Sequence, residues 1–180
     1  MKAAYLLAPL FLLAGLSSAA VAADTNVTLS NVHLCCGKCI TGAEAALKPV
    51  TGAKADISAP DKTITITAPD KATAQKAVDA LVAAGYFGKS SDDSVKLDAS
   101  TGATEEKVKT LEVSGVHLCC GSCVTAVNAV ADKVPGITGK TIKPNAKTIS
   151  FTGDFSSKAF FDELQKAGLT GKVAAPAKPQ

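Results

Sequence analysis

The stretch VHLCCGKC at residues 32–39 is repeated, with one change, as VHLCCGSC at residues 116–123. The chain has 180 residues, with six cysteines and two histidines, and all eight lie inside these two windows. Cysteines used only for packing would be scattered over a fold, so their concentration here indicates a shared chemical purpose. The two windows divide the chain into two copies of one unit.

The similarity of the two copies extends beyond the windows. Thr41 aligns with Thr125 and Gly52 with Gly136, at the same offset that aligns the windows. Two copies are too few for a solenoid, in which each repeat is stabilised by stacking on its neighbours. An apolar content of 47% is enough for each copy to bury a core of its own.

Each copy begins with alternating apolar residues, which predict a half-buried strand. In NVTLSNV (26–32) these residues are Val27 and Leu29, and in TLEVSGV (110–116) they are Leu111 and Val113. After each window, apolar residues recur three and four positions apart, as on one face of a helix. The predicted helix faces are Ile40, Ala43, Leu47 and Val50 in the first copy, and Val124, Val127, Ala131 and Val134 in the second.

A predicted β-hairpin and a second helix follow in each copy. The hairpin strands are KADIS (54–58) with KTITITA (62–68), and GKTIKP (139–144) with KTISFT (147–152). The second helix carries Ala74, Val78 and Leu81 in the first copy, and Phe160 or Phe161, Leu164 and Ala167 in the second. A short last strand is expected near residues 86–89 and 169–173.

The order of elements is therefore β-α-β-β-α-β in each copy. This predicts the α+β class, with two tandem ferredoxin-like βαββαβ sandwiches. We expect the modules at residues 24–89 and 108–173, a polar linker at 90–107 and a disordered tail at 174–180.

The first 23 residues, MKAAYLLAPLFLLAGLSSAAVAA, are typical of a secretory signal peptide. Their apolar run, from Tyr5 to Leu16, is shorter than the roughly 18–20 residues of a membrane-spanning helix. We therefore expect cleavage near Ala23, a periplasmic or secreted protein, and no stable membrane insertion after cleavage. The formal net charge is only +3 and the chain has no arginine, which argues against nucleic acid as a partner.

The windows place sulfur and imidazole at the junction of the first strand and first helix. In an extended segment His33 and Cys35 share one side and Leu34 takes the other. Cys36 and Cys39 have the Cys-x-x-Cys spacing at the helix start, where free amide groups stabilise thiolates. The equivalent residues of the second copy are His117, Leu118, Cys119, Cys120 and Cys123. Thiolates are soft ligands, so the windows predict sites for copper(I) or a similar ion.

These residues resemble the heavy-metal-associated domain family, which occurs in copper chaperones, copper-transporting ATPases and a periplasmic mercury-binding protein. The family motif, Gly-Met-Thr-Cys-x-x-Cys, lies between the first strand and first helix. CGKC and CGSC match its cysteines, AAGYFG (83–88) matches a common end of the second helix, and KAGLTG (166–171) keeps only its glycine. The resemblance implies that Cys36, Cys39, Cys120 and Cys123 are metal ligands, and that Leu34 and Leu118 are core residues in place of the methionine.

The departures from the family motif add ligands. His33 and His117 replace its glycine, and Cys35 and Cys119 replace its threonine. Two thiolates suit linear copper(I) or mercury(II), a third permits trigonal coordination, and Cys₃His suits tetrahedral zinc. We favour copper(I), on the prevalence of copper in the family. The hypothesis is two similar sites, one per module, in a protein that buffers metal or transfers it to a transporter or recipient metalloprotein. A flexible linker also permits the two sites to face each other over one ion or one partner, and the sequence does not decide between these arrangements.

Other interpretations stay open. Each Cys-x-x-Cys pair is also compatible with a structural disulfide. Cys35 and Cys119 are compatible with a role as small buried side chains. His33 and His117 are compatible with surface positions, or with hydrogen bonds that orient the metal ligands without binding the metal. Thiol–disulfide exchange is the alternative enzymatic function, and a crosslinked structural or partner-binding tandem is a third. No separate base accompanies a nucleophile, so we expect no hydrolase and, on the favoured hypothesis, no enzyme.

Overall fold

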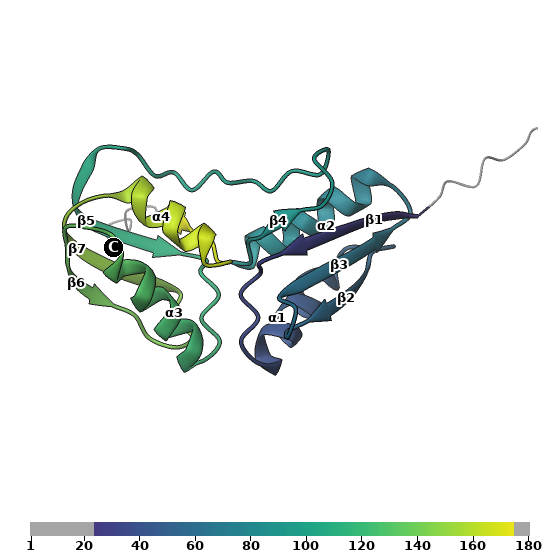
Figure 1. The fold of residues 1–180 in the computed structure, drawn as a ribbon, viewed down its shortest axis with the longest axis horizontal. Coiled ribbons are helices and arrows are strands. Elements are labelled where there is room, and N and C mark those ends of the chain that lie inside the picture. The colour runs from purple at the N-terminus through teal and green to yellow at the C-terminus, as the bar shows by residue number, and fades with distance from the viewer. Residues whose placement is uncertain (1–23, 175–180) are drawn as a thin grey trace, which may run out of the picture.

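The computed structural model describes residues 24–174 of the chain. The predicted signal peptide, and residues 175–180 of the predicted tail, lie outside the described residues. The described part forms two units of similar architecture that lie side by side, called module 1 and module 2 here (Figure 1). No helix in the described part is long and apolar enough to cross a membrane.

Module 1 is a four-stranded antiparallel sheet with two helices. Its elements are β1 (Thr25–Ser30), α1 (Gly37–Leu47), β2 (Lys54–Ser58), β3 (Thr63–Ala68), α2 (Lys71–Ala83) and β4 (Lys89–Ser90). The strand order is β2-β3-β1-β4, so β1 and β3 lie in the centre. This order, with one helix after β1 and one after β3, is the predicted ferredoxin-like arrangement.

Module 2 repeats this topology. Its elements are β5 (Lys107–Ser114), α3 (Gly121–Asp132), β6 (Ile137–Thr141), β7 (Thr148–Ser156), α4 (Ser157–Lys166) and β8 (Lys172–Val173). The strand order, β6-β7-β5-β8, corresponds strand for strand to that of module 1. The predicted α+β class with two βαββαβ units is therefore confirmed.

The alternating apolar residues of the first strand of each module point into the core, as predicted. Val27 and Leu29 in β1, and Val113 in β5, are fully buried. Leu34 and Leu118, which follow these strands, are 5% and 4% exposed, so their predicted packing role is also confirmed. Each window is thus anchored to its module by an apolar side chain between the histidine and the first cysteine.

The four helices begin in two different ways. Asp70 accepts a hydrogen bond from the Thr73 amide at the start of α2, and Ser156 caps α4 in the same manner. Cys36 and Cys120 occupy the equivalent positions before α1 and α3, but neither side chain makes a capping hydrogen bond. Serine, threonine, aspartate and asparagine are the usual residues at such positions, so these two thiols are not used for capping.

The modules meet where their second helices end. Tyr86, after α2, pairs with Leu169, after α4, as an isolated antiparallel bridge. The Thr170 amide donates to the Gly85 carbonyl at 3.0 Å, and the Phe87 amide donates to the Gly168 carbonyl at 3.1 Å. Tyr86 and Leu169 are both completely buried, so this junction is a packed part of the molecule.

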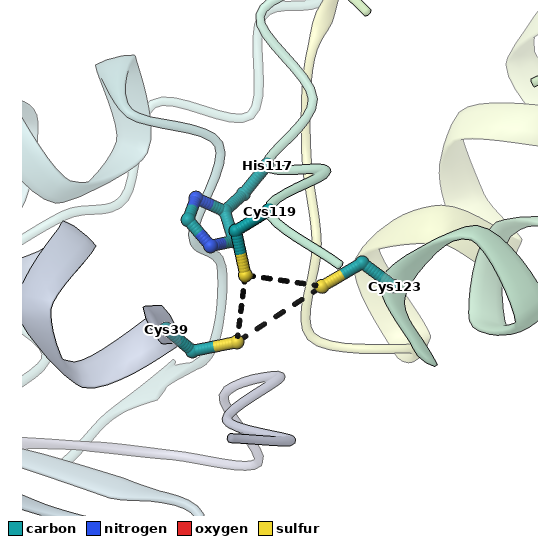
Figure 2. A group of neighbouring side chains, drawn as sticks. All are labelled: Cys39, His117, Cys119 and Cys123. Carbon is teal, nitrogen blue, oxygen red and sulfur yellow. Dashed lines mark hydrogen bonds between the residues drawn. The ribbon is translucent and has the colours of Figure 1, made fainter. Parts of the chain in front are cut away.

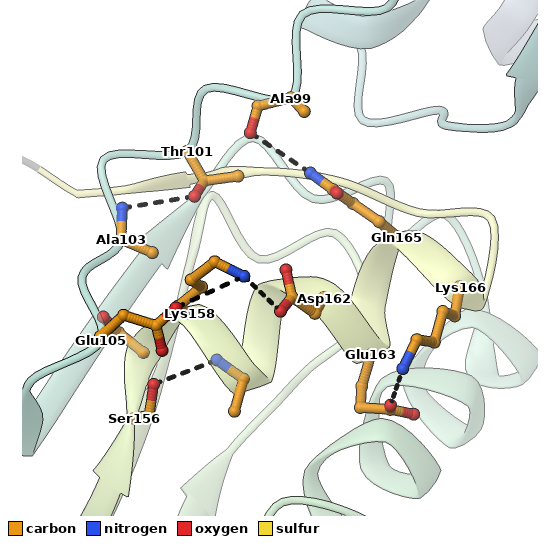
Figure 3. A network of polar contacts seen from close by, with 12 residues as sticks. Ala99, Thr101, Ala103, Glu105, Ser156, Lys158, Asp162, Glu163, Gln165 and Lys166 are labelled. Carbon is orange, nitrogen blue, oxygen red and sulfur yellow. Dashed lines mark hydrogen bonds and ion pairs between the residues drawn. The ribbon is translucent and has the colours of Figure 1, made fainter.

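The segment between the modules, residues 91–106, has no helix or strand but lies along both modules. Gln75 of α2 exchanges two hydrogen bonds with the Lys96 backbone, at 2.6 and 2.8 Å. Farther along, Gln165 of α4 donates to the Ala99 carbonyl at 3.4 Å, as Figure 3 shows. Val95, a residue of this segment, is almost fully buried. The predicted linker therefore follows α2 and then α4 as a strap.

Candidate metal centre

The two windows approach each other at the module junction. Each module presents a glycine to the other module's window. A Cβ atom added to Gly85 would fall on the His117 backbone nitrogen, and one added to Gly168 would fall on the backbone at Asn31 and His33. The His33 amide donates to the Gly168 carbonyl at 3.1 Å. Only glycine lets the backbones come this close.

Within each module, the Cys-x-x-Cys sulfurs converge as predicted. The Sγ atoms of Cys36 and Cys39 lie 4.0 Å apart, and those of Cys120 and Cys123 lie 3.7 Å apart. The local cause is the helix start, which turns both side chains of each pair toward the same point. Each pair is within reach of a common ion.

The same sulfurs also lie against the sulfurs of the other module. The Sγ atom of Cys35 is 3.5 Å from that of Cys120 and 3.6 Å from that of Cys123. The Sγ atom of Cys39 is 3.6 Å from that of Cys119, which is the same contact as that of Cys123 with Cys35 but with the modules exchanged. Ten of the fifteen sulfur–sulfur distances are between 3.5 and 4.0 Å.

The two predicted sites, one per module, therefore lie in contact with each other. The six sulfurs form one group, which we call the sulfur cluster, and six of the ten short distances join the two modules. The reason is the glycine-mediated junction, which lies outside the windows and brings their ends together. Sulfur atoms of neighbouring thiols in contact offer adjacent ligands for soft ions.

The six cysteines of the sulfur cluster differ in their exposure to solvent. All six cysteines are free thiols. Cys39 and Cys123 are completely buried, whereas Cys35 is exposed and the others are intermediate. An ion or a partner's thiol would therefore reach the cluster first at Cys35.

His117 is held by Tyr86 across the module junction. The Tyr86 hydroxyl donates to the Cys39 carbonyl at 2.7 Å and lies 3.2 Å from His117 Nε2. Since the hydroxyl has one proton, it accepts from Nε2–H, which leaves Nδ1 as the acceptor. Burial, and then the nearby His33, lower the pKa of His117, which favours this neutral form.

His33 has no such partner. Its Nε2 atom is buried and makes no hydrogen bond, and its pKa is lowered by burial and then by Lys62. Leu169 occupies the position in module 2 that Tyr86 occupies in module 1, and it has no hydroxyl to offer. The two histidines are therefore inequivalent, although the windows that hold them are almost identical.

The ligand atoms of His33, Cys35 and Cys123 all lie within 4.8 Å of one another. The predicted shared face of His33 and Cys35 is thus present, and Cys123 of the other module completes the group. A buried nitrogen without a hydrogen-bond partner is uncommon in folded proteins. Its place beside two sulfurs fits a role as a metal ligand.

The second group of ligand atoms contains three sulfurs and one imidazole. Cys39, His117, Cys119 and Cys123 offer atoms that all lie within 4.8 Å of one another, and Figure 2 shows the three sulfurs pointing together. Cys₃His is a donor set of tetrahedral zinc as well as of softer ions. Every residue predicted as a ligand from the sequence thus lies in or beside the sulfur cluster.

The environments of the thiols differ. The nearby backbone amide of Cys123 stabilises the thiolate of Cys120 and lowers the pKa of Cys120 to about 6. Partial desolvation of the sulfurs where they pack against one another raises the pKa values of Cys35, Cys119 and Cys123. Burial also opposes ionisation of Cys39, but hydrogen bonds from the backbone and side chain of Cys35 lower its pKa on balance. A cation would offset the cost of ionising the buried thiols.

Three contributors to the centre were not identified from the sequence. Tyr86 is part of the AAGYFG match to the family, but its hydrogen bonds to Cys39 and His117 depend on the module junction. Gly85 and Gly168 are recognisable as helix ends, and nothing in their local sequence shows that they contact the other module's window.

Comparison with known proteins gives only distant similarity. No protein-family model matches the chain, and no curated protein is significantly similar to it. Among solved structures, a copper binding domain from HMA7, a P-type ATPase, covers 38% of this chain and 96% of its own length, with 18% identity and a TM-score of 0.35. The N-terminal soluble domains of Bacillus subtilis CopA cover 85% of this chain and 95% of their own length, with 13% identity and a TM-score of 0.33. The assignment of the fold depends on the chain's own strand order.

Proposed function

We propose that this protein is an exported soft-metal-binding protein that buffers copper(I) or passes it to a partner. The observation that carries the proposal is the sulfur cluster, in which thiols of both modules lie 3.5–4.0 Å apart at a buried junction. Packing alone does not require six thiols in mutual contact. Thiolate sulfur favours copper(I) over hard cations such as magnesium or calcium.

The spacing of the sulfurs bears on the coordination geometry. A two-coordinate ion with thiolate bonds of about 2.3 Å needs sulfurs about 4.6 Å apart. The distances between neighbouring sulfurs here are 3.5–4.0 Å, which is too short for linear coordination but suits three or more ligands. Mercury(II) with added sulfurs, and zinc on the Cys₃His group, are the alternative ions.

Transfer would proceed by stepwise thiolate exchange. An incoming thiolate adds to the ion before a resident one leaves, so the exposed Cys35 is the natural point of exchange. The resemblance of CGKC and CGSC to the heavy-metal-associated motif supports a metal transporter or a recipient metalloprotein as partner. The signal-like residues 1–23 support export to the periplasm or the exterior.

A copper(I) titration tests this function. Reduced protein, purified without oxygen, is titrated against a competing copper(I) chelator, and bound metal is measured by elemental analysis. We expect the unmodified protein to retain copper(I) tightly and the double variant Cys39→Ser, Cys123→Ser to retain it much more weakly. Lys38→Ser is the matched control, because Lys38 is an exposed window residue whose equivalent in module 2 is serine, and its copper(I) affinity should be unchanged. Failure of the reduced protein to retain copper(I), mercury(II) or zinc would refute the proposal.

Thiol–disulfide exchange is the second candidate, because the lowered pKa of Cys120 beside Cys123 is typical of reactive Cys-x-x-Cys pairs. An insulin-reduction assay separates the two functions. Catalytic turnover by protein that retains no soft metal would favour the redox role, and metal retention without turnover would favour the binding role.

A further inference from the structure

We propose that the sulfur cluster forms two three-sulfur sites, each completed by a cysteine from the opposite module. The first site is Cys36, Cys39 and Cys119, and the second is Cys120, Cys123 and Cys35. This inference rests on the metal-binding function proposed above and assigns the ligands of each ion. It gives the first cysteine of each window a role in the other module's site.

The first site is a closed triangle of sulfurs. Cys36 and Cys39 come from the start of α1, and their sulfurs lie 4.0 Å apart. The sulfur of Cys119, from module 2, lies 4.0 Å from that of Cys36 and 3.6 Å from that of Cys39.

The second site is the equivalent triangle with the modules exchanged. Cys120 and Cys123 come from the start of α3, and their sulfurs lie 3.7 Å apart. The sulfur of Cys35, from module 1, lies 3.5 Å from that of Cys120 and 3.6 Å from that of Cys123. The exchange is reciprocal, as an approximate two-fold relation between the modules requires.

This division of the six sulfurs follows from the distances. The ten short distances close four triangles, and only these two triangles together use every sulfur once. A division by module fails, because neither Cys35 with Cys36 nor Cys119 with Cys120 is among the short pairs. Vicinal cysteines in an extended segment point to opposite sides, so each pair serves two different sites.

The triangles have a suitable size for soft ions. The point equidistant from the three sulfurs lies about 2.2 Å from each in the first triangle and about 2.1 Å in the second, close to the roughly 2.3 Å of metal–thiolate bonds. Three-coordinate copper(I) therefore fits each triangle with little movement. Each bound ion would also join module 1 to module 2.

A crossed set of variants tests the assignment in the full-length, reduced protein. The double variant Cys36→Ser, Cys39→Ser removes most of the first site and should still bind one copper(I). In this background, adding Cys35→Ser should weaken binding roughly tenfold or more, and X-ray absorption should show a loss from three sulfur neighbours to two. Adding Cys119→Ser instead should weaken binding much less and keep three sulfur neighbours, because Cys119 belongs to the site that this background has already lost.

The reciprocal background guards against an effect on folding. In the background of the double variant Cys120→Ser, Cys123→Ser, adding Cys119→Ser should weaken binding roughly tenfold or more, and adding Cys35→Ser should weaken it much less. We expect the unmodified protein to saturate with two copper(I) ions.

Other results would overturn the assignment while leaving metal binding intact. One such result is a pattern in which Cys35 supports binding by Cys36 and Cys39, and Cys119 supports binding by Cys120 and Cys123. Saturation at a single ion, or at four ions with every sulfur bridging, would also overturn it. Absence of any bound soft metal in the unmodified protein would overturn the proposed function as well.

Discussion

The sulfur of Cys36 lies 3.7 Å from the sulfur of Cys120, the residue at the equivalent position of the other module. The buried sulfurs of Cys39 and Cys123 are likewise 4.0 Å apart. Equivalent residues of two copies meet where an approximate two-fold axis passes between the copies. The sulfur cluster lies on this axis, so metal binding and module packing are expected to depend on each other.

Substituting Gly85 by alanine should separate the windows. The added Cβ would fall on the backbone of Gly115 and His117, and the residue has a φ of +88°, which disfavours any side chain. We expect copper(I) affinity to fall roughly tenfold or more, and the free energy of unfolding to fall by about 1–3 kcal/mol. Chelator competition and denaturant unfolding measure the two effects.

Gly52→Ala is the matched control. Gly52 has a φ of +87°, but the nearest atom to an added Cβ is in the Pro69 side chain at 3.4 Å, away from the junction. It should lose stability through backbone strain and keep its metal affinity. Equal loss of affinity in both variants would show that strain, and not separation of the windows, affects binding.

Removing the metal should destabilise the whole described unit. A ligand that binds only the folded state adds about 2.7 kcal/mol of stability when present at a hundredfold its dissociation constant. Because the sulfur cluster contains residues of both modules, we expect a copper(I) chelator to lower the unfolding midpoint of both together. Denaturant unfolding followed by probes in each module measures this, and stabilisation of one module alone would contradict it.

The two histidines should respond differently to substitution by leucine. His117→Leu leaves the Tyr86 hydroxyl without its donor, at an expected cost of about 1–2 kcal/mol in the free energy of unfolding. His33→Leu removes a buried nitrogen that has no partner, so metal-free stability should be unchanged or higher. Denaturant unfolding of the metal-free variants compares them, and equal losses would mean that the difference in hydrogen bonding has no energetic effect.

Sequence reasoning succeeds where the signal is local. The alternation at Val27 and Leu29 predicts β1 because side chains of a strand alternate between faces. The Cys-x-x-Cys spacing predicts the approach of Cys36 and Cys39 because one helical turn brings these positions together.

The shared sulfur cluster was not predictable in this way. It depends on contacts between Gly85 and the window of module 2, and between Gly168 and the window of module 1. No period or spacing in the sequence encodes such a contact. Considered within one window, Cys35 competes with Cys36 for one ion, whereas in the folded chain its nearest sulfurs include Cys120 of the other module.

Alkylation of the metal-free protein should begin at Cys120, although Cys35 is more exposed. The nearby backbone amide of Cys123 lowers the pKa of Cys120 to about 6, whereas partial desolvation of the sulfur and its contacts with neighbouring thiols raise the pKa of Cys35, and only the thiolate reacts quickly. At about pH 7 iodoacetamide should modify Cys120 first, and its rate should fall roughly tenfold per pH unit below about pH 6. Peptide mapping by mass spectrometry across this pH range measures the order. Modification of Cys35 before Cys120 would mean that access, and not ionisation, controls the chemistry of the sulfur cluster.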